Sequence, residues 1–307
     1  MLQRSVLFRP VEKLTILFSA LLVVAGLLRF GALSSRKELA FIALAGLLPV
    51  AGAFVRFRWP DPPLLVRIAD DFHILASILL IFDNLGPLVR AVSPVDRDPW
   101  LIAADRFLTG TDPTRVLEKF SAPLLSDVLT VFYALYFFHP LVLAALIWVE
   151  DRRERGGAGP DFHRYAFLIV LTFFVSYAGY FVVPALGPRA TLEHEGPLPR
   201  GAVATAVDAM LDRLESNKRD VFPSGHTMVT LAVVLLAAKR SRKLALVFLF
   251  FAVPLWLATV YGRYHYLVDV LVGFALTPIV LWAGREWLRK RVPETPQAAG
   301  SSLPTIR

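Results

Sequence analysis

The sequence predicts an all-α fold, a polytopic membrane helix bundle with about eight transmembrane helices that include a six-helix core. The first observation is composition: 56% of the 307 residues are hydrophobic, and the mean hydropathy is +0.56, which is typical of a membrane chain. The second is that long apolar segments recur through most of the chain, which favours one integrated bundle over two soluble domains. The third is the absence of cysteine, which excludes a disulfide framework, a zinc–thiolate cluster and a cysteine nucleophile.

Eight segments approach the roughly 20 apolar residues that a helix needs to cross the hydrocarbon core. The expected spans are residues 12–30, 39–57, 64–84, 125–149, 164–184, 224–239, 243–261 and 265–284. The first span follows basic residues, as in a signal peptide, but no small-x-small cleavage site follows it closely, so we expect it to be retained. The third span is the weakest because Arg67, Asp70, Asp71 and His73 crowd its start.

The spans and the composition divide the chain into three parts. Residues 1–60 hold two N-terminal transmembrane helices, and residues 61–291 form the membrane core. Residues 292–307 are rich in Pro, Ser and Gly and are predicted to be disordered.

Short basic loops predict the orientation of the bundle, because such loops are retained in the cytoplasm. Basic residues follow the fourth, sixth and eighth spans, which places both termini on the cytoplasmic side of an expected bacterial inner membrane. The basic residues within 34–38, after the first span, run against this orientation. The net charge of +8 is accounted for by such loops, so we expect no nucleic-acid partner. Residues 185–223 and the turn 261–266 then lie on the non-cytoplasmic face.

Two segments on that face are amphipathic rather than spanning. Residues 99–120 and 200–215 place apolar side chains at helical spacing with charged residues elsewhere on the wheel. Such helices lie at the level of the lipid headgroups. A second interpretation of residues 200–215 is a lid over a site that lipids enter.

The stretch FPSGHT predicts an anion site. Pro223 suits the first turn of a helix because its missing N–H would be unpaired there. Free N–H groups and the positive pole of the helix dipole then attract an anion. Gly225 allows close approach to the backbone, Ser224 adds a hydroxyl donor, and His226 can donate or accept a proton.

The stretch GRYHYLVDVLVG carries a second histidine. His265 and Asp269 are four residues apart and share a face if both lie on one helix. The carboxylate can then fix the imidazole tautomer and leave the other ring nitrogen free. Arg263 offers a planar guanidinium to phosphate oxygens. The alternative is a structural His–Asp pair that bridges helices.

Further basic residues lie on the same predicted face. Arg189 follows the end of the fifth span in PALGPR and would add a cation to the site. Lys218 and Arg219 contact either a phosphate or lipid headgroups. For the other four histidines we expect structural or interfacial roles.

These groups together predict phosphoryl transfer through a covalent phosphohistidine. One histidine attacks phosphorus, the other protonates the leaving alkoxide, and the anion donors stabilise charge on the phosphoryl oxygens. No acidic cluster suited to magnesium lies beside the motifs, so we expect no metal and no other cofactor. The expected partner is a phospholipid or lipid-linked phosphate within the bilayer. No feature of the sequence indicates an oligomeric state.

PSGHT and HYLVD resemble the second and third motifs of the type-2 phosphatidic acid phosphatase superfamily, which includes vanadium haloperoxidases. The resemblance covers the last five spans well and the first three poorly, and it implies a phosphatase-like core. It also implies that His265 is the nucleophile, Asp269 its orienting acid and His226 the acid for the leaving group. Ser224, Gly225 and Arg189 would bind the phosphate.

The motifs depart from the commonest branch of that superfamily. Val182 stands where the first motif has lysine, Ala190 replaces its proline, and Ala258 and Thr259 replace a Ser-Arg pair of the third motif. With DRFLTGTDP upstream, the chain is more similar to the inositol phosphorylceramide synthase branch, whose members move a phosphorylated headgroup onto a lipid. The departures therefore favour transfer to a hydroxyl. The alternatives are a lipid phosphate phosphatase, in which water is the acceptor, and a non-catalytic headgroup binder or transporter.

Overall fold

The computed structural model describes residues 8–33, 36–59, 61–214 and 218–291, and within these ranges the chain is helical without strands. The predicted disordered tail, residues 292–307, lies outside the described residues. The α-helices are α1 (Pro10–Leu28), α2 (Lys37–Arg58), α3 (Leu64–Asp83), α4 (Leu85–Val92), α5 (Asp98–Thr109), α6 (Pro113–Glu118), α7 (Pro123–Ala134), α8 (Phe138–Arg155), α9 (Pro160–Val182), α10 (Pro188–Thr191), α11 (Ala202–Leu214), α12 (Gly225–Ala238), α13 (Arg242–Tyr261) and α14 (Leu267–Arg291).

Six helical stretches in the described chain are long and apolar enough to cross a membrane. They are α1, α2, the run Pro123–Glu154, α9, α13 and α14. The run Pro123–Glu154 comprises α7 and α8 with a short 3₁₀ turn, Leu135–Phe137, between them. Two expected spans fall short: α12 is 14 residues long, and α3 carries Arg67, Asp70 and Asp71. The polytopic helix bundle is confirmed, with six candidate spans rather than eight.

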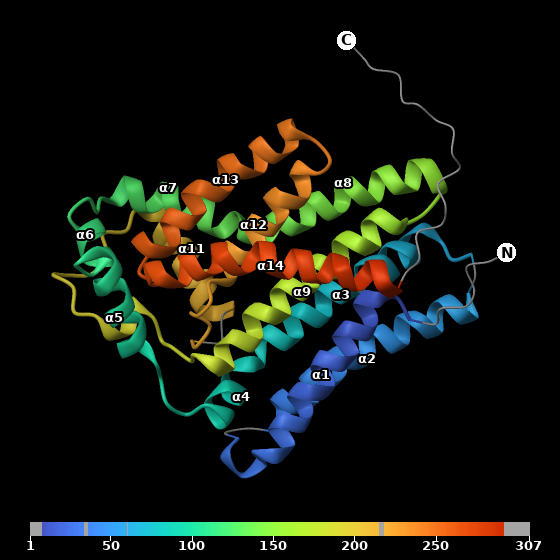
Figure 1. Ribbon diagram of the computed structural model, residues 1–307, viewed down its shortest axis with the longest axis horizontal. Helices are drawn as coiled ribbons and strands as arrows, with labels where there is room; N and C mark the ends of the chain where they lie inside the picture. Colours follow the sequence, from blue (N-terminus) through green and yellow to red (C-terminus); the bar gives the residue numbers. More distant parts are fainter. Residues whose placement is uncertain (1–7, 34–35, 60, 215–217, 292–307) are drawn as a thin grey trace.

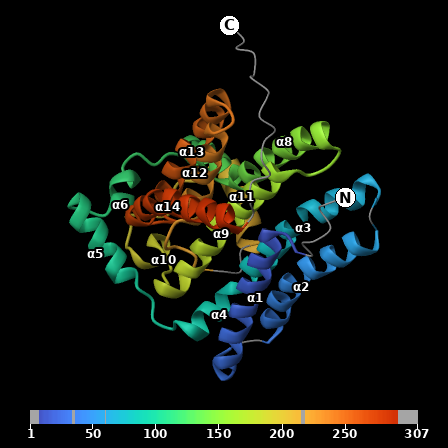
Figure 2. The same cartoon turned by 45° about the vertical axis from the view of Figure 1, so that its right-hand side comes forward.

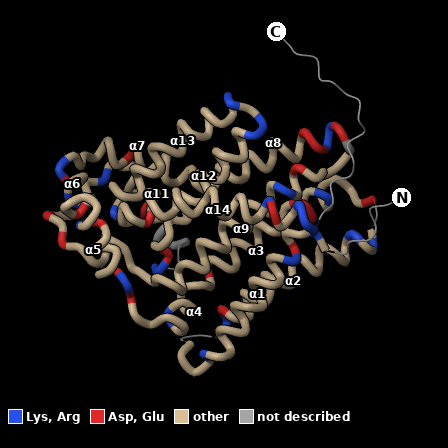
Figure 3. The backbone as a smooth tube through the Cα atoms, in the orientation of Figure 1, with Lys and Arg blue, Asp and Glu red and all other residues tan. Residues whose placement is uncertain are grey.

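The helices pack around α9, which is the most buried of the six. It contacts α1, α8, α12 and α14, and the main hydrophobic core lies along it. The pair α1–α2 packs beside α3, while α5 and α6 lie on the opposite side of the molecule from α2 (Figures 1 and 2). Charged residues gather towards the ends of the bundle, and the middle of α9, α12 and α13 is almost free of them (Figure 3). This distribution fits a helix bundle whose middle lies in hydrocarbon.

A partly buried ion-pair network explains the charges of α3. Arg56 of α2 pairs with Glu12 of α1 at 2.8 Å and with Asp70 of α3 at 2.6 Å. Arg9 pairs with Asp70 at 2.8 Å and with Asp71 at 3.0 Å. The charges that weaken the third predicted span therefore join α1, α2 and α3.

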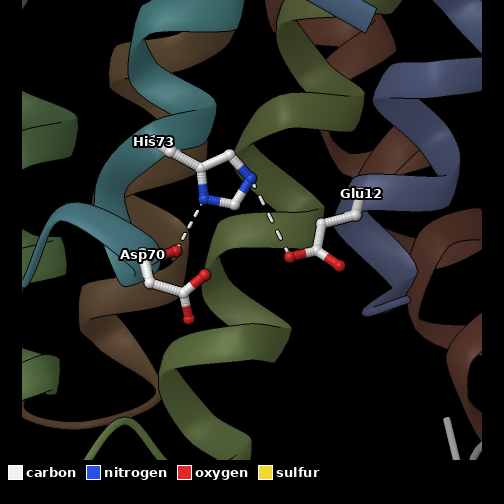
Figure 4. A group of neighbouring side chains, drawn as sticks. All are labelled: Glu12, Asp70 and His73. Atoms are coloured by element: carbon white, nitrogen blue, oxygen red, sulfur yellow. Dashed lines mark hydrogen bonds and ion pairs between the residues drawn. The ribbon is translucent and has the colours of Figure 1, made fainter. Parts of the chain in front are cut away.

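His73 completes this network (Figure 4). Its Nδ1 donates to the backbone oxygen of Asp70 at 2.6 Å, and its Nε2 lies 3.8 Å from Oε1 of Glu12. Glu12, Asp70 and His73 are close enough together to hold a cation. Two guanidinium groups already neutralise the carboxylates, so we interpret the cluster as a structural network.

We predict that Arg56→Met lowers the free energy of unfolding by about 3 kcal/mol, because it leaves the fully buried Glu12 carboxylate short of its cation. The measurement is thermal unfolding of the purified protein in detergent. Arg289→Met is the matched control, because Arg289 pairs with Glu286 at the exposed end of α14 and such pairs contribute about 0–1 kcal/mol. Equal midpoints for the two variants would contradict the assignment.

Candidate active site

Two predicted histidines meet at one end of the bundle. His226 lies in the first turn of α12, and His265 lies in the turn that directly precedes α14. Nδ1 of His226 is 3.3 Å from Nε2 of His265, within hydrogen-bonding distance. The side chain of His265 is 3% exposed. The fold therefore brings together two imidazoles that are 39 residues apart in the sequence.

Asp269 lies behind His265, but not through the helical spacing that the sequence suggests. Helix α14 begins at Leu267, so His265 precedes it. The Asp269 side chain instead folds back towards the turn, where its Oδ2 accepts from the backbone N–H of Tyr266 at 2.8 Å. That oxygen lies 3.6 Å from Nδ1 of His265. This is longer than a hydrogen bond.

Burial sets the charge of the His265 imidazole. It lowers the pKa of His265 to about 4, and the nearby Asp220 carboxyl opposes the shift without cancelling it. His265 is therefore neutral at neutral pH, and its Nε2 lone pair is available as a nucleophile.

Helix α12 begins at Gly225 rather than at Pro223. Ser224 is the N-cap, and its hydroxyl oxygen accepts from the backbone N–H of Thr227 at 3.3 Å. Pro223 therefore precedes the cap instead of occupying the first turn, which corrects the prediction. The backbone N–H of Ser224 donates to the carbonyl oxygen of Asp269 at 3.2 Å. This bond joins the two histidine-bearing segments.

Gly225 allows α12 to approach α9. A Cβ at this position would lie 2.9 Å from Oγ of Ser176 and 3.0 Å from the hydroxyl of Tyr180, both on α9. A side chain at this position would require these hydroxyl groups to shift. Close approach of an anion was the expected reason for this glycine, and helix packing supplies another.

The predicted cations differ in burial and in their contacts. Arg263 has a φ of 62° and is buried, and its guanidinium contacts Glu118 and the carbonyl oxygen of Gly196, each at 2.9 Å. Arg219 pairs with Asp96 at 2.8 Å. These guanidiniums therefore tie segments of the chain together.

Lys218 and Arg189 are both exposed. The Arg189 guanidinium lies 5.7 Å from the centre of the Tyr264 ring, and no carboxylate of the described residues pairs with it. Of the predicted phosphate-binding arginines, Arg189 has the guanidinium that an anion can most readily reach.

An aromatic stack that the motifs do not reveal surrounds His226. Tyr133 of α7 stacks on His226 with ring centres 4.6 Å apart and on Tyr264 at 4.5 Å. Tyr136 lies 4.4 Å from His226 on another side. The two tyrosines are three residues apart, so they share a helix face, and that spacing is the signal in the sequence.

A mostly apolar cavity of about 130 Å³ leads to His226. Its walls come from α3, α8 and α9 and from the turn between α7 and α8. Gly225, His226 and Asp220 line one part, and Asp71 and Phe162 line another. Apolar side chains of α3, α8 and α9 account for most of the remaining lining, so the cavity suits a hydrocarbon chain.

Comparison with known proteins identifies relatives of this chain. A family model described as the PAP2 superfamily matches residues 99–283, more than half of the chain and all three motifs. A PA-phosphatase related-family protein of Dictyostelium discoideum is 29% identical over 120 residues, which are 38% of this chain and 22% of that protein. The matched part is thus about a fifth of that relative's length. No solved structure matches the chain significantly.

We predict that Gly225→Ala slows turnover of a lipid phosphate on the order of 10²-fold, because the new methyl group pushes His226 away from His265. Ser176→Ala in the same chain should restore part of the rate, since it removes the atom 2.9 Å away. Gly157→Ala is the control, because nothing lies within 4 Å of its Cβ position. A wild-type rate for the single Gly225 variant would show that this contact does not position the histidine.

Proposed function

Because the chain belongs to the PAP2 superfamily, we propose that it is an integral-membrane lipid phosphotransferase that acts through a phosphohistidine. It moves a phosphoryl group or a phosphorylated headgroup from a lipid-linked donor to a hydroxyl of a lipid or polyol. The observation that carries this proposal is the histidine pair, His265 buried and His226 half-buried, with ring nitrogens 3.3 Å apart beside an apolar cavity. The cavity would take a hydrocarbon chain of the donor and bring its phosphate to the pair.

In the first step, Nε2 of His265 attacks phosphorus and the bond from phosphorus to the leaving oxygen breaks. His226 gives a proton to that oxygen, which departs as an alcohol. Nε2 of His265 faces His226 at 3.3 Å, so a phosphoryl group on that atom requires His226 to turn away, towards the leaving oxygen. Asp269 stabilises the positive charge that develops on the His265 ring, as the acid of a triad does.

In the second step, His226 removes a proton from the acceptor hydroxyl, whose oxygen attacks phosphorus. The nitrogen–phosphorus bond then breaks, and His265 is regenerated. The phosphoryl oxygens are held by the N-terminus of α12 at Ser224 and Gly225 and by Arg189. This chemistry needs no metal and no other cofactor.

Arg263, Lys218 and Arg219 have smaller roles in this proposal. The guanidiniums of Arg263 and Arg219 are held by Glu118 and Asp96, so they would reach a phosphate only by leaving those carboxylates. Arg263 still adds positive potential near the site, since it lies two residues before His265.

Transfer to a hydroxyl, as in inositol phosphorylceramide synthases, is favoured by the departures at Val182, Ala190, Ala258 and Thr259. A lipid phosphate phosphatase uses the same residues with water as the acceptor. We place both termini in the cytoplasm of a bacterial cell and the histidines on the outer face of the inner membrane, because the short loops at the opposite ends of the helices are basic.

His265→Ala should abolish turnover, with a loss on the order of 10⁴-fold or more, because it removes the nucleophile. Purified protein in detergent is given ³²P-labelled phosphatidic acid or phosphatidylinositol labelled in its headgroup phosphate, with and without ceramide as acceptor. His163→Gln, at the far end of α9, is the control. Label on ceramide supports transfer, and label released only to water supports the phosphatase. An unaffected His265 variant overturns the assignment of the nucleophile.

The proposed nucleophile also predicts a pH dependence. The pKa of His265 is lowered to about 4, so the reactive neutral form persists down to that pH and is lost as the pH falls further. The ¹⁵N shifts of the imidazole nitrogens in histidine-labelled protein measure this titration directly, with His265→Gln to assign the signals. The acid limb of kcat/KM for a phosphodiester donor should follow it. A titration of His265 near 6.5 would contradict this environment.

A further inference from the structure

Helix α5 carries two buried carboxylates that belong to neither histidine motif. Asp98 and Asp105 are 3% and 2% exposed, although α5 lies at the edge of the molecule and exposes Trp100 and Phe107. They are seven residues apart, close to two helical turns, so they share one face of α5. That face is turned towards the turns that carry the cations and the histidine.

Asp98 holds the loop that leads to Arg189. Its Oδ1 accepts from the backbone N–H groups of Gly187 at 2.8 Å and Leu186 at 3.1 Å, and its Oδ2 accepts from Leu186 at 3.0 Å. Oδ1 also accepts from the hydroxyl of Tyr266 at 2.8 Å. Asp98 is therefore bonded both to the segment before Arg189 and to the residue after His265.

Asp105 holds the start of α14. Its Oδ2 accepts from the backbone N–H of Leu267 at 2.9 Å, and its Oδ1 accepts from that of Val268 at 2.7 Å. These are the first two N–H groups of the helix, which have no partner within it. A carboxylate at this positive pole acts as an N-cap supplied by another helix. The capped turn directly follows His265.

We propose that Asp98 and Asp105 are positioning residues, which fix the distance between the Arg189 loop and the His265 turn through one rigid helix. The inference rests on the phosphotransferase function proposed above and adds a part of the chain that the motifs do not explain, the segment DPWLIAADRFLTGTDP. In this segment Arg106 and Asp112 form a bidentate pair that closes the turn after α5. Neither Asp98 nor Asp105 touches phosphate; each acts through backbone that carries a functional group.

This role makes a kinetic prediction that a purely structural role does not. The N–H groups that the carboxylates satisfy lie within three residues of Arg189 or His265. A displacement near 1 Å at the reacting atoms reduces rates on the order of 10²-fold. Binding of the lipid chain involves α3, α8 and α9 instead. Loss of either carboxylate should therefore lower kcat and leave KM nearly unchanged.

The test compares Asp98→Asn, Asp105→Asn and Tyr266→Phe with wild type and His265→Ala, using the labelled donor that the wild type consumes. The three variants should lose about 10- to 100-fold in kcat, with KM within about threefold of wild type. Asp112→Asn is the matched control from the same segment, because its side chain contacts the arginines Arg106 and Arg115 rather than the catalytic turns. It should retain kcat within about twofold.

The outcomes separate this inference from the proposed function. If the wild type shows no turnover that depends on His265, the proposed function fails and the inference fails with it. If that turnover exists and the Asp98 and Asp105 variants keep wild-type kcat, or lose activity through KM alone, the inference is overturned and the function stands. If an Asn variant is not monodisperse in detergent, a second variant replaces it. Tyr266→Phe then tests the role of Asp98. Asp105→Glu, which keeps the carboxylate but displaces it, tests the role of Asp105.

Discussion

The first turn of α12 is packed so closely against two other helices that an added methyl group on either side would require its neighbours to shift. Gly225 provides the clearance to α9, and Gly273 provides it to α14, where a Cβ would lie 3.1 Å from Cβ of Thr227 and 3.2 Å from the carbonyl oxygen of Ser224. Because α14 follows His265 directly, this packing decides where the two imidazoles meet. Interiors at this density tolerate little displacement, so the geometry of the site depends on the packing of three helices.

Polar groups that cannot reach water must find partners within the chain, and both ends of the bundle follow this rule. At one end, Arg9 and Arg56 compensate the carboxylates of α1 and α3. At the other, Asp105 satisfies the first amides of α14. The first arrangement joins the N-terminal helices to each other. The second fixes the start of α14, two residues after His265.

Patterns in short stretches of the sequence predicted most of the features that depend on neighbouring residues alone. Hydropathy located the apolar helices, and FPSGHT and HYLVD identified the two histidines and Asp269, because each motif is a single turn with its neighbours. The rest depends on distant partners. From the sequence alone, Arg263 was predicted to be available to a phosphate. In the structure its guanidinium pairs with Glu118, which is 145 residues away. Tyr133 and Asp98 contact the site only through tertiary packing. The charges of α3 look unfavourable for burial until Arg9 and Arg56 are placed beside them.

The cavity beside His226 is lined by residues inside and outside the segment that the family model matches. Part of its wall belongs to α3, between Asp71 and Phe82, which lies outside residues 99–283 matched by the superfamily. The histidines and the helix N-terminus that faces them lie inside that range. Under the proposed function, a change in α3 would alter the shape of the cavity and leave His226 and His265 as they are. On that proposal, preference for the length or branching of the lipid chain would depend partly on a segment outside the matched range, and bond breaking on the histidine motifs inside it.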